Sequence, residues 1–269
     1  MNRFMKNKKI ILILIFVLLV VLWCVSCGRG AYFEPEWEKE DISALLQKEE
    51  LSEGDYSFLR SQTGLSKRGI DSLIESGQKE EIYEFQEQYF APCEYEMEYL
   101  FAPIVAYEHK AGERLKKVPL EKGDVLVSLT THSLGFRHGH AGLVLDEKRG
   151  TTLEHMVIGE LSSYSNVSTW GIYPTFAVLR HKDKEVAERA VEYAKEKLVG
   201  VPYNPLAGII DKDKSDEEEI NHSHCSHLVW QAYFAVGADI DGNGGRMVLP
   251  KDFLKCPDFE IVQLYGIRP

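Results

Sequence analysis

Hydrophobic and polar residues follow three different patterns along the chain. Residues 10–25 form an unbroken apolar run. From residue 41 to about residue 115, apolar residues recur every three or four positions, which predicts amphipathic helices. After Pro119 the apolar residues gather in short β-branched runs, which are typical of strands. The pattern therefore predicts three parts of the chain, namely residues 1–27, 28–118 and 119–269.

The middle part begins with an acidic and aromatic tether and continues as a set of short helices. Glycines at positions 64 and 77 follow two of these helices, where a helix commonly ends. The expected helices begin at Asp41, Ser52 and Ser66, and a fourth covers residues 79–89. No group of residues suited to catalysis occurs among them, so we expect this part to serve in packing and spacing.

The last part combines strands with two longer helices, which predicts a segregated α+β domain. One helix is expected over residues 185–198, and a second runs from the residues after His222 to Gly237. Strands are expected at residues 124–129, 140–145, 151–158, 176–180 and 259–265.

Cys225 lies at the start of the second of these helices, inside a histidine-rich stretch. His222, His224 and His227 are close to it in sequence. The free N–H groups and the positive dipole end of a helix start favour a thiolate, which is the nucleophilic form of cysteine. A buried structural cysteine is the alternative at this point.

A cysteine nucleophile needs a base, and the base needs a third polar group to orient it. His140 stands at the start of a predicted strand beside Gly139, and Glu154 lies in the next strand. Neighbouring strands can present both side chains on one face of a sheet. We therefore predict a Cys225–His140–Glu154 triad, with His138 as the competing histidine.

These motifs resemble the permuted branch of the NlpC/P60-like superfamily of papain-fold cysteine hydrolases, close to the YiiX and YycO type. The matching runs are Gly-Asp-Val-Leu at 123–126, Gly-His-Ala-Gly-Leu-Val at 139–144, Leu-Glu at 153–154, Gly-Val-Pro-Tyr-Asn at 200–204, Cys-Ser-His-Leu-Val-Trp at 225–230 and the stretch 239–252. Their order over residues 119–269 is more specific than a single motif. His224 and His227 depart from the residue types that are common at those positions.

The resemblance implies an α+β, circularly permuted papain-like barrel, with Cys225 as nucleophile, His140 as base and Glu154 as the orienting group. It also implies a cysteine amidase or peptidase that cleaves an amide bond in cell-wall peptides through a thioester, without a cofactor. The backbone N–H of Cys225, at a helix start, is the expected oxyanion donor. The alternative is a non-catalytic module that holds an acyl chain or a peptide on the same fold.

Two metal sites are weaker alternatives. Zinc prefers imidazole and thiolate ligands, but the histidines around Cys225 lie within six residues, too close to form a tetrahedron without strain. Residues 239–244 match the first half of a calcium-binding loop. Pro250 occupies the twelfth position, where such a loop requires a bidentate glutamate, so we expect a glycine turn.

The N-terminus resembles an export signal, with a basic head before the apolar run. Cys24-Val25-Ser26-Cys27 resembles a lipobox, so we expect either a lipoprotein modified at Cys27 or an uncleaved signal anchor, with the remaining chain outside the cytoplasm. Cleavage before Cys27 removes four basic residues and lowers the formal net charge from −11 to −15. Such a surface repels nucleic acid, so we expect no nucleic-acid partner.

Three cysteines remain outside the N-terminal segment, and an odd number leaves one thiol unpaired in an oxidising compartment. The sequence allows a Cys93–Cys256 disulfide with Cys225 free, but spacing in the sequence does not fix the Cα distance that a disulfide requires. The acidic stretch 211–219 leads almost directly into Cys225. We predict that it is a mobile flap at the rim of the cleft, with a solvated linker as the alternative.

Overall fold

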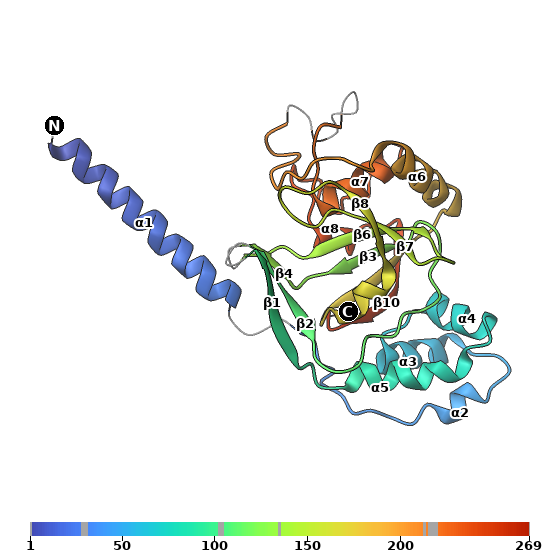
Figure 1. Cartoon of the computed structure of the whole chain (residues 1–269). Helices are drawn as coiled ribbons and strands as arrows, with labels where there is room; N and C mark the ends of the chain where they lie inside the picture. The colour runs from blue at the N-terminus through green and yellow to red at the C-terminus, as the bar shows by residue number, and fades with distance from the viewer. Residues whose placement is uncertain are drawn as a thin grey trace.

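Two antiparallel sheets organise the chain in the computed structural model, which describes residues 2–27, 32–101, 105–133, 136–211, 214 and 220–268. Helices lie on both sides of the larger sheet (Figure 1). The protein is therefore a mixed α+β structure with antiparallel sheets, as the sequence pattern predicts.

The larger sheet has six strands in the order β10-β9-β3-β6-β7-β8, all with antiparallel neighbours. Its strands are β3 (Val125–Ser128), β6 (His140–Asp146), β7 (Thr151–Glu154), β8 (Ser163–Asn166), β9 (Phe176–His181) and β10 (Phe259–Tyr265). The central strands are buried on both faces, so they contain continuous apolar runs and not an alternating pattern.

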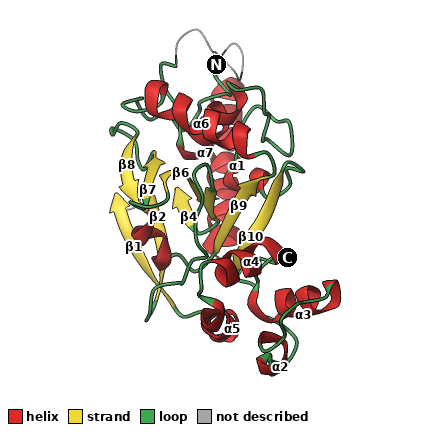
Figure 2. Cartoon of the chain, turned by 90° about the vertical axis from the view of Figure 1, so that its right-hand side faces the viewer, coloured by secondary structure: helices red, strands yellow, loops and turns green. Residues whose placement is uncertain are grey.

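Alternate residues of these strands face two separate hydrophobic clusters. Val125 and Val127 face the first cluster, which contains α6 (Lys184–Lys197) and α7 (Cys225–Phe234). Leu126, between them, faces the second cluster, together with the helices of the middle part of the chain. The sheet is thus the central layer between two helical layers (Figures 1 and 2).

Two helices of the middle part begin and end where the sequence predicts, whereas the first starts at Ser43 after Ile42 and the fourth is split into a 3-10 turn and a helix. Ser52 forms a capping box before α3, Ser66 caps α4, and Gly64 ends α3 in the left-handed region, at φ 71°. Ser66 Oγ also donates to Glu260 on β10, at 2.7 Å, which joins this layer to the sheet. The helices are α2 (Ser43–Leu46), α3 (Glu53–Thr63), α4 (Lys67–Glu75), the 3-10 turn η1 (Lys79–Glu81) and α5 (Ile82–Phe90).

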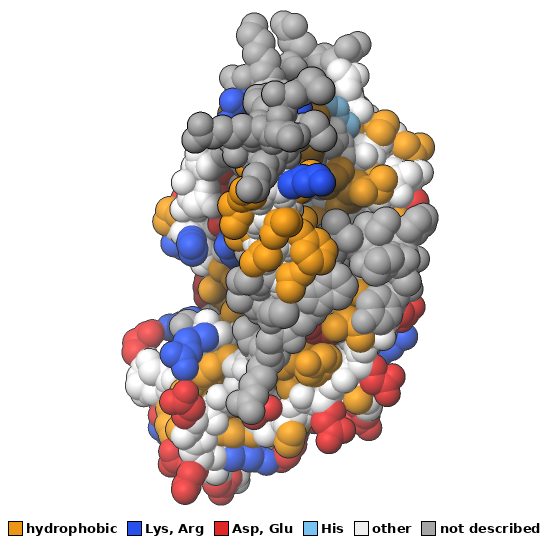
Figure 3. All heavy atoms as spheres, turned by 90° about the vertical axis from the view of Figure 1, so that its left-hand side faces the viewer, with side chains coloured by type: hydrophobic (Ala, Val, Ile, Leu, Met, Phe, Trp, Pro, Cys, Tyr) orange, Lys and Arg blue, Asp and Glu red, His pale blue; other side chains and the backbone are white. Residues whose placement is uncertain are grey.

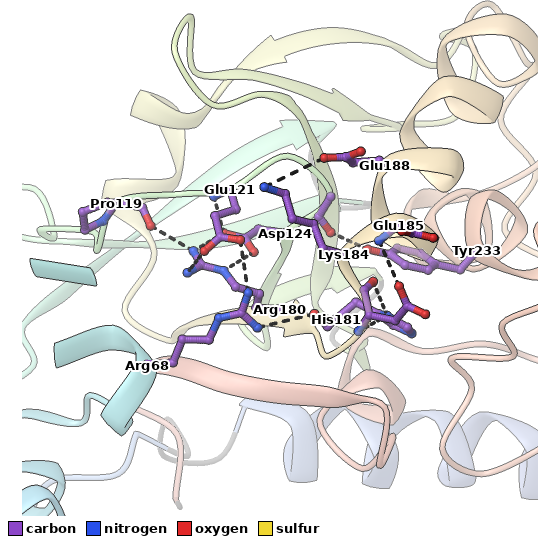
Figure 4. A network of polar contacts seen from close by, with 12 residues as sticks. Arg68, Pro119, Glu121, Asp124, Arg180, His181, Lys184, Glu185, Glu188 and Tyr233 are labelled. Atoms are coloured by element: carbon purple, nitrogen blue, oxygen red, sulfur yellow. Dashed lines mark hydrogen bonds and ion pairs between the residues drawn. The ribbon is translucent and has the colours of Figure 1, made fainter. Parts of the chain in front are cut away.

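A buried ionic network ties the sheet to the turn that precedes it (Figure 4). Arg180 on β9 makes two hydrogen bonds to the carboxylate of Asp124, at 2.7 and 2.8 Å. It also pairs with Glu121, which in turn binds Arg68 of α4. Because removing one partner would leave a buried charge unpaired, this network fixes the start of β3 against both β9 and α4.

The smaller sheet has the order β1-β2-β4-β5. Its strands are β1 (Tyr95–Phe101), β2 (Val105–Lys110), β4 (Thr131–Ser133) and β5 (Phe136–Arg137). The prediction of helices as far as residue 115 is therefore wrong for residues 95–110. Glutamate alternates with apolar residues from Glu94 to Tyr99, which is the two-residue period of a strand. The predicted strand at 151–158 is also shorter than expected, because β7 ends at Glu154.

The helix α1 (Asn2–Cys27) leads away from the rest of the chain (Figure 1). Large apolar side chains from Ile10 to Val20 are exposed on it. Figure 3 views the side on which α1 projects and shows hydrophobic side chains gathered in the middle of that face. Within the described residues, no helix reaches the length and hydropathy required to cross a membrane. The membrane anchor stays a prediction.

The Cys93–Cys256 disulfide that the sequence allows is not formed, because Cys93, Cys225 and Cys256 are all free thiols. Cys256 belongs to the first hydrophobic cluster. Cys93 follows α5 and interacts with Tyr265, which belongs to the second cluster. The two cysteines therefore lie on opposite sides of the larger sheet.

Candidate active site

Cys225 is the first residue of α7 and is 5 % exposed. The residue before it, His224, has an extended backbone, and its side chain accepts a hydrogen bond from the N–H of His227, as a helix cap does. The backbone N–H of Cys225 lies at the helix start, where N–H groups have no partner inside the helix. Leu228, Val229 and Ala232 hold the helix against the sheet, as the periodicity predicts.

The register of β6 and β7 brings His140 next to Glu154. Glu154 pairs with Gly142, and His140 lies two residues before Gly142 on the same face of β6. Diagonal neighbours of this kind are close enough for side-chain contact. His140 Nε2 is 2.8 Å from Glu154 Oε2, and both residues are 3 % exposed. The other ring nitrogen of His140, Nδ1, is left to hydrogen-bond with Cys225.

Three residues fix the position of Glu154 and His140. Thr152 Oγ1 donates to Glu154 Oε1 at 2.5 Å, and Trp170 Nε1 donates to the same oxygen at 3.0 Å. The Trp170 ring also stacks on His140, with centroids 5.0 Å apart. A Cβ at Gly142 would lie 2.8 Å from the Trp170 ring, so only glycine leaves room for this arrangement. Sequence reasoning missed Thr152 and Trp170.

The three groups shift one another's pKa values. Burial alone would lower the pKa of His140, but its hydrogen bonds with Cys225 and Glu154 outweigh burial and raise it to about 10. Burial opposes a thiolate, yet a hydrogen bond from His140 and the interaction with His224 lower the pKa of Cys225 well below its usual range. Burial likewise opposes the carboxylate, while His140 lowers the pKa of Glu154. At neutral pH the arrangement is a thiolate–imidazolium ion pair beside a carboxylate.

A cavity of about 230 Å³ opens next to Cys225. Its wall is mostly apolar, and none of the side chains that line it is an acid, a lysine or an arginine. The lining residues are His138, Tyr203, Pro205, Leu206, His224, Cys225, Ser226, Met247, Leu249 and Pro250. The thiolate is therefore accessible from a space large enough for a small acyl group.

The remaining histidines of the sequence motif are held by other contacts. His227 Nδ1 is 3.0 Å from Ser223 Oγ, its Nε2 donates to the carbonyl of Lys214, and its ring stacks on Trp230. Burial lowers the pKa of His227 to about 4, which keeps its imidazole neutral. His222 pairs with Asp211 at 2.8 Å. Among the described residues, no three histidine, cysteine or acidic side chains are grouped as metal ligands, so the zinc alternative has no ligand set there.

The sequence analysis singled out two other loops, and the structure describes one of them, next to α7. In residues 239–244, where the sequence partly matches a calcium loop, Asp239 accepts from Trp230 at 2.7 Å and Asp241 pairs with Lys214, so both carboxylates are engaged inside the protein. Gly244 has φ 65°, which fits the glycine turn that we expected. The predicted acidic flap falls mainly on residues 212–213 and 215–219, which lie outside the described residues.

Comparisons with known proteins give a structural likeness and no family. A scan against family profiles finds no match, and a search of curated proteins also finds none. Among solved structures, the chain is similar to the metalloprotein YiiX from Escherichia coli O157:H7, with a TM-score of 0.40 and 16 % sequence identity. That match covers 55 % of this chain and 99 % of YiiX. It is a weak structural likeness to a YiiX protein and defines neither the activity nor the site.

Proposed function

We propose that this protein is a cysteine hydrolase, an amidase or peptidase that acts through a thioester. The observation that carries the proposal is the continuous chain of side-chain contacts from Cys225 through His140 to Glu154, beside a cavity that reaches the sulfur. A nucleophile, a base and an orienting carboxylate in hydrogen-bond contact are what acyl transfer by cysteine requires.

The reaction begins from the ion pair. The Cys225 thiolate attacks the carbonyl carbon of the substrate, and the backbone N–H of Cys225 donates to the oxyanion that forms. His140 then gives its Nδ1 proton to the leaving amine, which leaves a thioester on Cys225 and a neutral imidazole. The neutral His140 takes a proton from water as the water attacks the thioester. Release of the acid restores the thiolate and the imidazolium.

For the fold, the proposal includes a circularly permuted papain-like barrel formed by residues 119–269. The support for it is the chain order, in which strands carry His140 and Glu154 and a later helix carries Cys225. Residues 28–118 would then be a separate part, with the helices α2 to α5 and the strands β1 and β2, that packs on the barrel. Expression of residues 119–269 alone tests the boundary. Activity of this fragment supports it, whereas an unfolded fragment shows that β2, which pairs with β4, and the helices that cover the sheet belong to the same domain.

The substrate that the resemblance implies is an amide bond in a cell-wall peptide. Digestion of purified cell wall with the purified protein, followed by mass analysis of the fragments, tests this directly. We expect new amine and carboxyl ends in the fragments, and Cys225→Ala protein is the control. The same fragments from the control, or none from either protein, would exclude a cell-wall amidase.

A second candidate is a site for an apolar acyl group, bound with or without turnover. The cavity favours it, because its wall is mostly apolar and offers a charged cell-wall peptide no acidic, lysine or arginine side chain. Rates with p-nitrophenyl esters from acetyl to octanoyl separate the candidates. A rate that rises with chain length supports the acyl group, whereas a flat or falling series excludes it.

For localisation, we propose that residues 1–27 hold the protein at the membrane, outside the cytoplasm. The apolar run and the exposed side chains from Ile10 to Val20 support this. Labelled palmitate should be incorporated in the wild type and lost in Cys27→Ala, which is the lipoprotein outcome. Membrane association without any label indicates the uncleaved anchor, and a fully released protein contradicts both.

A further inference from the structure

A second imidazole lies next to Cys225 and has no role in the triad. His224 is only 6 % exposed and lines the same cavity as Cys225. Its position as the cap of α7 fixes its backbone and one of its ring nitrogens. The other ring nitrogen, Nε2, is therefore the one that can take part in the chemistry of the site.

The cap determines which nitrogen of His224 carries the hydrogen. The backbone N–H of His227 donates to Nδ1 of His224, at 3.3 Å. A backbone N–H can only donate, so Nδ1 must be unprotonated, and the hydrogen of the neutral ring is on Nε2. Ser226 Oγ lies 3.3 Å from the same Nδ1 and sends its own hydrogen to the carbonyl of Val248.

The Nε2 atom of His224 is buried and makes no hydrogen bond, to sulfur or to any other acceptor, among the described residues. An unpartnered buried donor costs free energy unless a ligand or a reaction uses it. Cys225 is the next residue in the chain and lines the same cavity, and interaction with His224 lowers the pKa of its thiol. The Cys225 thiolate therefore explains why this N–H donor is buried without another partner.

We propose that His224 donates its Nε2 hydrogen to the Cys225 thiolate, so that two imidazoles with different tasks hold the nucleophile. His140 exchanges its proton with the substrate, whereas His224 keeps its proton throughout the cycle. No bond to hydrogen breaks at His224, so the proton balance of the reaction is unchanged. This inference rests on the proposed function of Cys225 and adds a catalytic residue to it.

The other titratable groups that interact with Cys225 are His138, His155 and Tyr203. Neither histidine offers the same donor. His155 Nε2 is 3.4 Å from the carbonyl of Glu160, so the hydrogen of its neutral ring is on Nε2 and is already engaged. His138 Nδ1 is 2.7 Å from the carbonyl of Gly139, so the hydrogen of its neutral ring is on Nδ1 and its Nε2 is an acceptor. Burial lowers the pKa of both His138 and His155, which keeps them neutral near pH 7.

The test is the pH dependence of alkylation of Cys225 by iodoacetamide, followed by mass analysis of the peptide that contains Cys225. The variant is His224→Asn, because asparagine is a good helix cap and keeps an acceptor for the N–H of His227 while it removes the Nε2 donor. We expect the midpoint of the profile to rise by about one pH unit, so that alkylation at pH 6 slows about tenfold.

The high-pH plateau separates this role from a structural one. A thiolate of higher pKa is at least as nucleophilic, so the plateau rate of His224→Asn should equal or exceed that of the wild type. His224→Ala, which loses the cap as well, should show the same midpoint shift and a lower melting temperature than His224→Asn. An unchanged midpoint in His224→Asn overturns the inference, and so does a lower plateau at an unchanged midpoint.

The wild-type profile keeps the two proposals distinguishable. A wild-type midpoint near that of free cysteine, about 8.5, contradicts an activated nucleophile and with it the proposed function. A low wild-type midpoint that His224→Asn leaves unchanged contradicts only the role of His224.

Discussion

Two buried histidine–glutamate pairs lie in different sheets of this protein, and they differ in what faces the imidazole. In the larger sheet, His140 is 2.8 Å from Glu154. In the smaller sheet, His132 on β4 is 2.7 Å from Glu108 on β2, and both are almost completely buried. By distance and burial the two pairs are nearly identical.

The two pairs differ in the side chain that contacts them. The guanidinium of Arg137 reaches Glu108 at 2.6 Å and lies 3.3 Å from His132. It supplies the positive charge that a buried carboxylate needs. No arginine reaches Glu154 among the described residues, and His140 lies between that carboxylate and the sulfur of Cys225. The positive charge must therefore come from His140 itself.

This difference shows that a buried histidine–carboxylate pair does not by itself indicate catalysis. The pair in the smaller sheet is an internal ion cluster that joins two strands. The pair in the larger sheet is arranged to hold a protonated imidazole against a thiolate, beside a cavity. The variants below are chosen to test that contrast.

The largest expected effect comes from replacing the nucleophile or its base. Cys225→Ala and His140→Gln should each lower the rate of hydrolysis by about 10⁴-fold or more, and the double variant should lose no more than either single one, because the two residues act as one unit. Steady-state rates with p-nitrophenyl acetate check this. Losses that multiply in the double variant would show that the residues act independently.

The matched control is His132→Gln in the smaller sheet. It should lower the free energy of unfolding by about 1–3 kcal/mol, because it disturbs a buried polar cluster, and should leave kcat within about twofold of the wild type. A large loss of activity in a stably folded His132→Gln would erase the contrast between the two pairs.

Glu154→Gln should lower kcat by about 10²- to 10⁴-fold with little change in KM. An amide cannot stabilise the imidazolium, and it can hold the ring in the wrong tautomer. Glu108→Gln is the paired change in the smaller sheet. If Glu154→Gln keeps more than half of the wild-type kcat, the carboxylate does not orient His140.

The pH dependence of activity follows from the directions of the two pKa shifts. Activity should be constant over neutral pH, fall below the lowered pKa of Cys225, and fall again above about pH 10, where His140 loses the proton that it gives to the leaving group. Each limb should approach a tenfold change per pH unit. A rate that rises with pH up to 9 would indicate an ordinary thiol.

The same shifts affect stability. The pKa of His140 is raised in the folded state, so its contribution is fully present below about pH 6.5, the unfolded value, and is lost as the pH rises through about 10. Cys225→Ala should remove much of this dependence, because the thiolate is one of the two anions beside His140. Denaturant unfolding at pH 7 and pH 10 measures it, and an unchanged dependence would contradict the ion pair.

Among the residues around His140, the smallest expected effect is that of Trp170→Phe. Phenylalanine keeps the ring beside His140 but cannot donate to Glu154, which still accepts from Thr152. We expect a loss of about tenfold or less in kcat, and Trp170→Ala should cost more. Equal effects of the two changes would show that only the N–H group of Trp170 matters.

Local patterns predicted much of the structure. The caps at Ser52 and Ser66, the helix ending near Gly237, and the strands around His140 follow from periodicity and turn chemistry, and the structure contains them. The glutamate alternation at 94–99 was also present in the sequence. The prediction of a helix over these residues was wrong, because it extended the pattern of the neighbouring helices and did not use the alternation of residues 94–99.

The support around the site could not be predicted in the same way. Trp170 and Thr152 meet at Glu154 through tertiary packing, and no spacing in the sequence relates the tryptophan to the carboxylate. The polar strand β8 has no hydrophobic pattern to identify it. The placement of His140 beside Glu154 was predicted as a shared sheet face, and the register of β6 and β7 brings the two side chains together.

The most direct measurement is the mass of the enzyme during reaction with p-nitrophenyl acetate. We predict a transient acetyl adduct on the peptide that contains Cys225, formed within the burst of p-nitrophenolate and lost by hydrolysis. In His140→Gln the adduct should form far more slowly, whereas in His132→Gln it should form at the wild-type rate. Acetylation of Cys93 or Cys256 in its place, or equal labelling of Cys225 in the wild type and His140→Gln, would contradict a Cys225–His140 hydrolase.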